Sequence, residues 1–202
     1  REWSYSSQFV ESAVFIPGSG GGTDYIWNID SGNCSSQKLQ KRDINDGTVV
    51  SEYTLPGYVS CDIGGMDQDP STGNILIIEK YSDTIHSIDS GNGQAISQQS
   101  LWDQNPGDMF YPPGGAESLA VETIDGEVKI LLGKQNKLFM IGWETNPGGI
   151  LGGFQTPLMD VTGLGGGTVG TVWLADKSNK KIYQASLPGA TSTETTTAGN
   201  YG

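Results

Sequence analysis

Short apolar stretches, separated by turns rich in Asp, Asn and Gly, recur along the whole chain. Residues 38–55 and 84–101 align without a gap, and both have the order strand, Asp/Asn/Gly turn, strand that is typical of a β-hairpin. No stretch has the sustained 3.6-residue period and the caps of a helix. The pattern predicts an all-β chain with almost no helix.

The hairpin belongs to a longer repeat. Its first strand recurs at residues 137–141 and 181–185, and two further strands precede each copy. The strands directly before it are residues 25–29, 75–79, 128–132 and 172–176, and those before them are residues 12–16, 63–67, 118–122 and 161–165. Four-stranded propeller blades repeat about every 40 to 50 residues, as these copies do. We therefore predict a four-bladed β-propeller with four-stranded antiparallel blades, whose strands we call a, b, c and d from the axis outwards.

The predicted propeller domain covers residues 1–189, and residues 190–202 form a Ser/Thr-rich tail or linker. The blades fall at about residues 11–57, 58–103, 112–157 and 158–189. The fourth blade lacks an outer strand of its own. Residues 3–9, in which aromatic and polar residues alternate, are predicted to supply it and to close the ring, because an unpaired edge invites another chain. In the alternative, residues 191–197 supply this strand.

Two segments resemble known propeller repeats. Residues 69–76, Asp-Pro-Ser-Thr-Gly-Asn-Ile-Leu, look like the turn between strands a and b of such proteins, and residues 166–182 resemble the NHL and SMP-30-like repeats. The resemblance implies a propeller architecture. Those families commonly have six blades, whereas four repeats are counted in this chain.

The balance of charge narrows the range of partners. The chain of 202 residues has 11 Lys and Arg against 23 Asp and Glu, a formal net charge of −12. A surface of this sign repels phosphate, so we expect no nucleic-acid partner and no attraction to anionic membranes. No apolar run reaches the length of about 18 residues that suggests a membrane-spanning helix, so we also expect no membrane insertion.

Several features indicate a secreted protein. The chain has two cysteines, Cys34 and Cys61, and Asn33 begins an Asn-Cys-Ser glycosylation triplet. The tail carries candidate sites of O-glycosylation at Thr191, Thr193 and Thr195. The chain begins at Arg1, and we interpret it as a mature or excised form of a longer, extracellular product.

The blade register also predicts a disulfide. Cys34 falls in the loop between strands b and c of the first blade, and Cys61 falls in the connection into the second blade. In a propeller these two kinds of loop lie on one face, so a bridge is plausible if the Cα atoms come within about 7 Å. Such a bridge would stabilise the fold by roughly 3 kcal/mol. In the alternative, both residues are free, buried thiols.

An acidic residue stands at the same offset before strand a of every blade. These residues are Glu11, Asp62, Glu117 and Asp160. Because strand a lines the axis, we expect their carboxylates to ring one mouth of the channel, where like charges need a counter-ion. Oxygen ligands suit Ca²⁺, so the ring is a candidate metal site. The alternative partners are turn amides and the lysines that end three b strands, Lys80, Lys134 and Lys177.

The longest loop joins the second and third blades, and it holds a candidate binding platform of Trp102, Phe110 and Tyr111. Aromatic side chains on a rigid scaffold can bind a sugar or a protein; in the alternative they pack the loop onto the domain. His86 is the only histidine, and we expect it between blades. No nucleophile elbow or phosphate-binding glycine motif accompanies it, so we predict no catalytic residues.

Two classes of function remain. The first is a non-catalytic extracellular module for binding, adhesion or structural assembly, with a carbohydrate or protein partner or with self-association into a larger assembly. The second is a calcium-dependent hydrolase, lactonase- or esterase-like, of the SMP-30 kind, in which the acidic ring holds the metal. The single histidine, the Thr-rich tail and the lack of a catalytic motif favour the first class.

Overall fold

The fold consists of strands joined by short turns. The computed structural model describes residues 10–18, 20, 22–30, 36–57, 59, 62–101, 115–124, 126–134, 137–143, 149–155, 161–166, 171–177, 180–186 and 199–200. Over these residues the structure has no α-helix, as the sequence predicts. Nor does the described part contain a helix that is long and apolar enough to span a membrane.

The strands form four separate antiparallel sheets. The first sheet is β1 (Val10–Ile16), β2 (Tyr25–Asp30), β3 (Lys38–Asp43) and β4 (Val49–Thr54), and the second is β5 (Ile63–Gln68), β6 (Ile75–Glu79), β7 (Thr84–Ile88) and β8 (Ala95–Ser100). The third is β9 (Ala116–Ile124), β10 (Glu127–Lys134), β11 (Lys137–Gly142) and β12 (Gly149–Gln155), and the fourth is β13 (Val161–Gly166), β14 (Thr171–Asp176), β15 (Lys181–Ser186) and β16 (Gly199–Asn200). Each sheet has its strands in chain order, which confirms the predicted all-β architecture of four-stranded antiparallel units.

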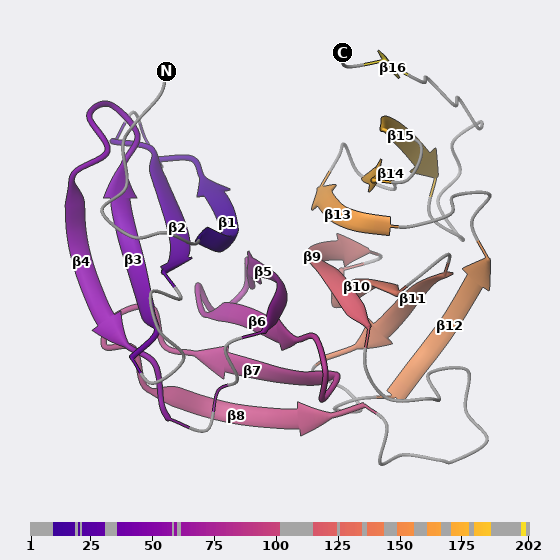
Figure 1. Cartoon of the computed structure of the whole chain (residues 1–202), viewed down its shortest axis with the longest axis horizontal. Helices are drawn as coiled ribbons and strands as arrows, with labels where there is room; N and C mark the ends of the chain where they lie inside the picture. Colours follow the sequence, from indigo (N-terminus) through magenta and orange to yellow (C-terminus); the bar gives the residue numbers. More distant parts are fainter. Residues whose placement is uncertain are drawn as a thin grey trace.

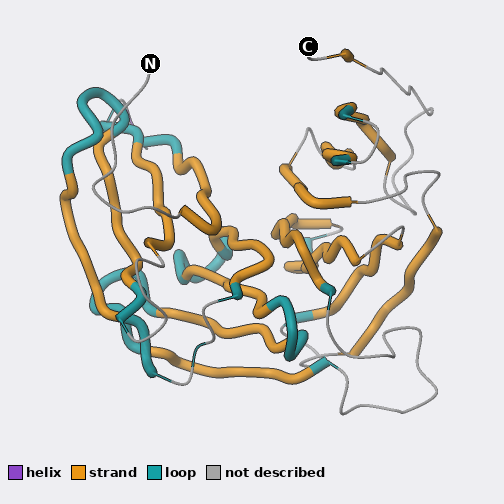
Figure 2. Tube along the Cα trace, viewed as in Figure 1, coloured by secondary structure: helices purple, strands orange, loops and turns teal. Residues whose placement is uncertain are grey.

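The first strand of each sheet contacts its counterpart in the next sheet. β1 packs against β5, β5 against β9, and β9 against β13. Figure 1 shows the sheets following one another around an arc, with the first and fourth sheets apart at its two ends, and Figure 2 shows the turns that join the strands. The described residues therefore form an open arc of four sheets.

The hydrophobic core lies between the faces of neighbouring sheets. Between the first and second sheets it includes Trp27, Ile29, Leu39, Ile75 and Ile77. Between the second and third it includes Leu76, Ile78, Ile85, Ile130, Leu132 and Phe139. Between the third and fourth it includes Leu131, Leu138, Val172 and Leu174. In the second and third sheets, β6 and β10 are nearly continuously apolar, as expected of strands that are covered on both faces.

Three turns share one pattern of hydrogen bonds. In the turn between β5 and β6, Asp69 Oδ1 accepts a bond from the Ser71 amide at 2.8 Å, and the Gly73 amide donates to the Asp69 carbonyl at 2.8 Å. Gly73 has φ 76°, in the left-handed region that glycine adopts without strain. The turns that begin at Asp43 and Asp89 repeat these bonds. The Asp-to-Gly turns read from the sequence thus form as predicted.

The outer position of the fourth sheet is occupied by β16, in which Asn200 lies opposite Lys181 of β15. β16 falls within the segment that the sequence assigns to a tail, and it takes the place predicted for residues 3–9 or, in the alternative, for residues 191–197. Both of those segments lie outside the described residues. Closure of the ring by residues 3–9 therefore stays a prediction.

Candidate functional site

The structure brings two of the four predicted acids to one lysine. Lys80, directly after β6, forms an ion pair with Glu117 of β9, with 2.5 Å between Nζ and Oε1. The Lys80 amide donates to the carbonyl of Asp62 at 2.7 Å. The hydrogen bond to Glu117 is the main cause that raises the pKa of Lys80, and the charge of Asp62 adds to it. For Glu117 this is the lysine alternative that the sequence left open.

The other two acids cannot be placed in a ring. Glu11 belongs to β1, but its side chain lies outside the described residues, and so does the whole of Asp160. Within the described part, no three His, Cys, Asp or Glu side chains gather as a metal site would require. A calcium site at the four acids therefore stays a prediction.

Lys134 has a partner that the sequence reasoning did not find. Its Nζ lies 2.7 Å from Oδ2 of Asp83, and both side chains are buried. Asp83 stands in the turn after β6, with φ 47°, and its Oδ1 accepts a bond from the Ala116 amide at 3.1 Å. The Asp83 carboxylate thus links the second sheet to the third. In the sequence, the signal for this partner is the acidic residue Asp83 in the turn before the third strand of the second sheet.

A second carboxylate joins the same two sheets nearer the inner strands. Asp67 Oδ2 of β5 accepts a hydrogen bond from the Val121 amide of β9 at 2.8 Å. Burial raises the pKa of Asp67 to about 6, against hydrogen bonds from the Val121 and Gln68 amides that lower it. The two strands come close here because β5 carries Gly64 and Gly65, where a Cβ atom would meet the backbone of β9.

A cavity of about 670 Å³ opens on the second sheet. It is lined by Glu79, Thr84, His86, Ala95, Ile96, Ser97 and Gln98. His86 Nε2 lies 3.1 Å from Oε1 of Glu79, and Ser82 donates to the other oxygen of the same carboxylate. The acid therefore stands between the serine and the histidine, whereas nucleophilic catalysis needs the histidine in the middle. This geometry suits binding better than activation of Ser82.

The far face of the fourth sheet, which points away from the third, exposes two large apolar side chains. They are Trp173 of β14, 40% exposed, and Ile182 of β15, 36% exposed. Their neighbours along the strands, Val172 and Leu174, point the other way into the core shared with the third sheet. We call Trp173 and Ile182, with Ala175 opposite Ile182, the fourth-sheet face.

The positions that correspond to Trp173 and Ile182 are covered in each of the other three sheets. The strand register identifies them as Trp27 and Leu39 in the first sheet, Leu76 and Ile85 in the second, and Leu131 and Leu138 in the third. All six are at most 2% exposed, because the next sheet packs on them. The fourth sheet keeps an apolar residue at both positions, with Gln184 opposite Trp173, but no following sheet covers them within the described residues.

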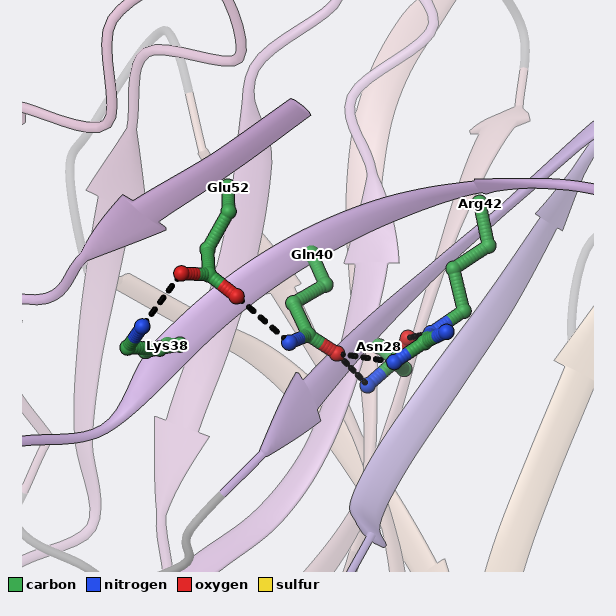
Figure 3. A network of polar contacts seen from close by, with 5 residues as sticks. All are labelled: Asn28, Lys38, Gln40, Arg42 and Glu52. Atoms are coloured by element: carbon green, nitrogen blue, oxygen red, sulfur yellow. Dashed lines mark hydrogen bonds and ion pairs between the residues drawn. The ribbon is translucent and has the colours of Figure 1, made fainter. Parts of the chain in front are cut away.

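The far face of the first sheet, at the other end of the arc, carries a polar network beside the exposed Phe15. Asn28, Gln40 and Glu52 lie side by side on β2, β3 and β4 and point away from the second sheet. Gln40 donates to Glu52 at 2.7 Å, and Arg42 donates to Gln40 at 2.7 Å and to Asn28 at 3.1 Å. Lys38 completes this network, which Figure 3 shows, by an ion pair with Glu52. Hydrogen bonds from Lys38 and, to a smaller extent, from Gln40 lower the pKa of Glu52.

The remaining predicted site residues lie outside the described residues. They are the disulfide pair Cys34 and Cys61, the binding platform Trp102, Phe110 and Tyr111, and the glycosylation sites Asn33, Thr191, Thr193 and Thr195. Each of these stays a prediction.

Comparison with known proteins gives a likeness of fold. No protein-family model matches the chain, and no curated protein matches it in sequence. A protein of unknown function from Bacteroides caccae superposes with a TM-score of 0.61 at 13% identity, over 91% of this chain and 65% of that one. The WD40 repeats of RRP9 give 0.60 at 10% identity, over 98% and 52% of the two chains. A streptogramin B lyase gives 0.56 at 18% identity, over 92% and 53%.

These neighbours include WD40 and other propeller-like proteins of varied function. The chain spans from about half to about two thirds of their length. No neighbour distinguishes an NHL or SMP-30-like propeller from the others, so that finer resemblance stays a prediction. The comparisons show that the chain is similar in fold to propeller-type proteins.

Proposed function

We propose that the chain is a non-catalytic β-propeller module that works through contact with protein, as a binding, adhesive or structural unit outside the cell. The four sheets are its blades. The observation that carries the proposal is the fourth-sheet face: Trp173 and Ile182 are exposed where the corresponding residues of three other sheets are covered. Tryptophan is enriched among the residues that dominate protein interfaces.

Two further observations support this function. Propeller-type folds, including the WD40 repeats among the neighbours, offer rigid surfaces for binding, and the fold alone does not imply catalysis. In the cavity, the buried Glu79 accepts a hydrogen bond from Ser82 with one oxygen and has its other oxygen 3.1 Å from His86 Nε2, so the acid and not the histidine lies beside Ser82. The extracellular setting rests on the sequence, namely the two cysteines, the Asn33 triplet and the Thr-rich tail.

Hydroxyl-radical footprinting tests the proposal. The side chains of Trp173 and Ile182 are compared between the native material, as isolated from its source, and the purified chain after dilution. We expect both residues to be protected in the native material. Equal labelling in the two samples would contradict the proposal, and so would a lactonase or esterase activity that disappears with a chelator.

A further inference from the structure

We propose that the cavity on the second sheet binds a neutral sugar, whose hydroxyl groups form hydrogen bonds with the polar side chains that line it. The inference goes beyond the proposed function, because it concerns the second sheet and not the fourth-sheet face. At about 670 Å³ the cavity falls within the range of pockets that hold small organic ligands, about 300 to 1,000 Å³. Its lining comes from β6, β7 and β8.

Four polar side chains of the lining share one face of the sheet. His86 of β7 lies opposite Ile77 of β6 on one side and opposite Gln98 of β8 on the other. Glu79 follows Ile77 by two positions along β6. Thr84 precedes His86 by two positions along β7, so all four point to the same side. Because Ile77 belongs to the core shared with the first sheet, the polar group stands on that face beyond the apolar core.

The deepest part of the lining is polar where two other sheets are apolar. The side chains of Glu79 and His86 are at most 7% exposed. The strand register matches His86 with Phe139 in the third sheet and Tyr183 in the fourth, and both of these pack against the core shared with the preceding sheet. Replacing a buried ionisable pair by apolar residues often leaves stability unchanged or higher, so folding alone does not require Glu79 and His86 here.

The lining suits a ligand that both donates and accepts hydrogen bonds. The Glu79 carboxylate only accepts, whereas the Thr84 hydroxyl and the Gln98 amide both donate and accept. A sugar hydroxyl has both capacities. An ammonium group only donates, so it offers no acceptor to the Gln98 amide. An anionic ligand is repelled by Glu79 and by the net charge of −12.

The rim of the cavity adds an apolar surface. Ile96 lies where the register between β7 and β8 shifts, and its side chain is 56% exposed. Such β-bulges re-aim side chains and are frequent beside functional sites. The C–H groups of a sugar ring form an apolar face that can cover Ile96 and Ala95, which removes apolar surface from water. A neutral sugar therefore matches both the polar and the apolar parts of the lining.

NMR spectra of the imidazole group test the proposal without further assignment, because His86 is the only histidine of the chain. Neutral mono- and disaccharides are added singly to the folded chain, each as the free sugar and as its methyl glycoside. We expect at least one sugar to shift the imidazole signals saturably at millimolar concentration. Binding of both forms indicates the end of a glycan as the ligand, and binding of the free form alone indicates a free sugar.

Substitutions separate binding in the cavity from an effect elsewhere. Gln98→Ala should raise the dissociation constant by about 3- to 10-fold, as the loss of one hydrogen bond implies. Gln99→Ala is the matched control and should leave the constant unchanged, because Gln99 is the next residue of β8 and lies opposite Ile85, which packs towards the third sheet. Glu79→Gln should weaken binding by at least about 10-fold, since hydrogen bonds to a charged group are stronger.

Circular dichroism shows whether each variant is folded, and Gln98→Ala decides the matter if Glu79→Gln is not. The proposal is overturned if no sugar shifts the imidazole signals, or if Gln98→Ala and Gln99→Ala bind the sugar as tightly as the wild type. A saturable shift with ethanolamine but with no sugar overturns it in favour of an amine site. None of these outcomes depends on Trp173, so the proposed function is tested separately.

Discussion

Substitution of Asp67 by Asn should make the protein more stable at neutral pH. The pKa of the partly buried carboxyl of Asp67 is about 6 in the folded chain, whereas its ordinary value is 3.8. The folded state thus binds this proton more tightly than the unfolded state. Its contribution to stability is complete below about pH 4 and is lost as the pH rises through 6.

The magnitude follows from the two pKa values. Each pKa unit corresponds to about 1.4 kcal/mol, so ionised Asp67 costs on the order of 2 to 3 kcal/mol of unfolding free energy at pH 7.5. Asp67→Asn removes the charge and keeps an oxygen for the Val121 amide, now 2.8 Å from Oδ2, but its NH2 group cannot accept from the Gln68 amide, now 2.8 Å from Oδ1. We expect a gain at pH 7.5 that is smaller than this by the lost Gln68 bond, about 1 kcal/mol, and no gain at pH 4.

Urea unfolding of both proteins between pH 4 and pH 8 measures the effect. Asp67→Ala should instead be destabilised at every pH, because it leaves the Val121 amide without its acceptor, at a cost of about 1 to 3 kcal/mol. Asp46→Asn is the matched control, a fully exposed carboxyl whose pKa is lowered by hydrogen bonds from Thr48, and it should gain nothing at pH 7.5. An Asp67→Asn variant less stable than the wild type at pH 7.5 would refute the reasoning.

Three further predictions concern the contacts between neighbouring sheets. Lys134→Met should cost about 3 to 5 kcal/mol in urea unfolding, since it removes the cation that neutralises buried Asp83, and adding Asp83→Asn should recover part of the loss. Gly65→Ala should lower the melting temperature by several degrees, because its Cβ would lie 2.5 Å from a backbone nitrogen of β9, while Gly57→Ala, with open space around it, should be nearly neutral. Calorimetry with calcium and then EDTA tests the ring of acids: calcium at one hundred times its dissociation constant stabilises by about 2.7 kcal/mol if it binds, whereas neutralisation of Glu117 by its lysine partner predicts an unchanged melting temperature.

The sequence predicts those features that depend on local periodicity. The first three strands of every sheet lie within a few residues of their predicted positions, whereas the outer strand of the fourth sheet does not. The turn from Asp69 to Gly73 forms because an Asp side chain and a left-handed Gly decide it locally. Contacts between sheets are harder to predict from the sequence. The blade register leaves pairing of the acids with lysines open as an alternative, and Lys80 does pair with Glu117, but the register does not reveal that Asp83 reaches Lys134 across 51 positions of the chain.

The exposure of a side chain was the least predictable feature. Trp173 and Leu76 occupy equivalent positions in apolar strands, and only the packing of the next sheet makes one exposed and the other buried. The polar network of the first sheet was likewise missed. Its signal is present in β2, where Asn28 interrupts an otherwise apolar strand, but a single polar residue does not show which of the two faces lacks a neighbour.

A cryo-electron microscopy reconstruction of the native material tests the central claim most directly. The account predicts that Trp173 and Ile182 are covered by an apolar protein surface. A reconstruction in which Trp173 faces solvent, with no other protein against the fourth-sheet face, would contradict it.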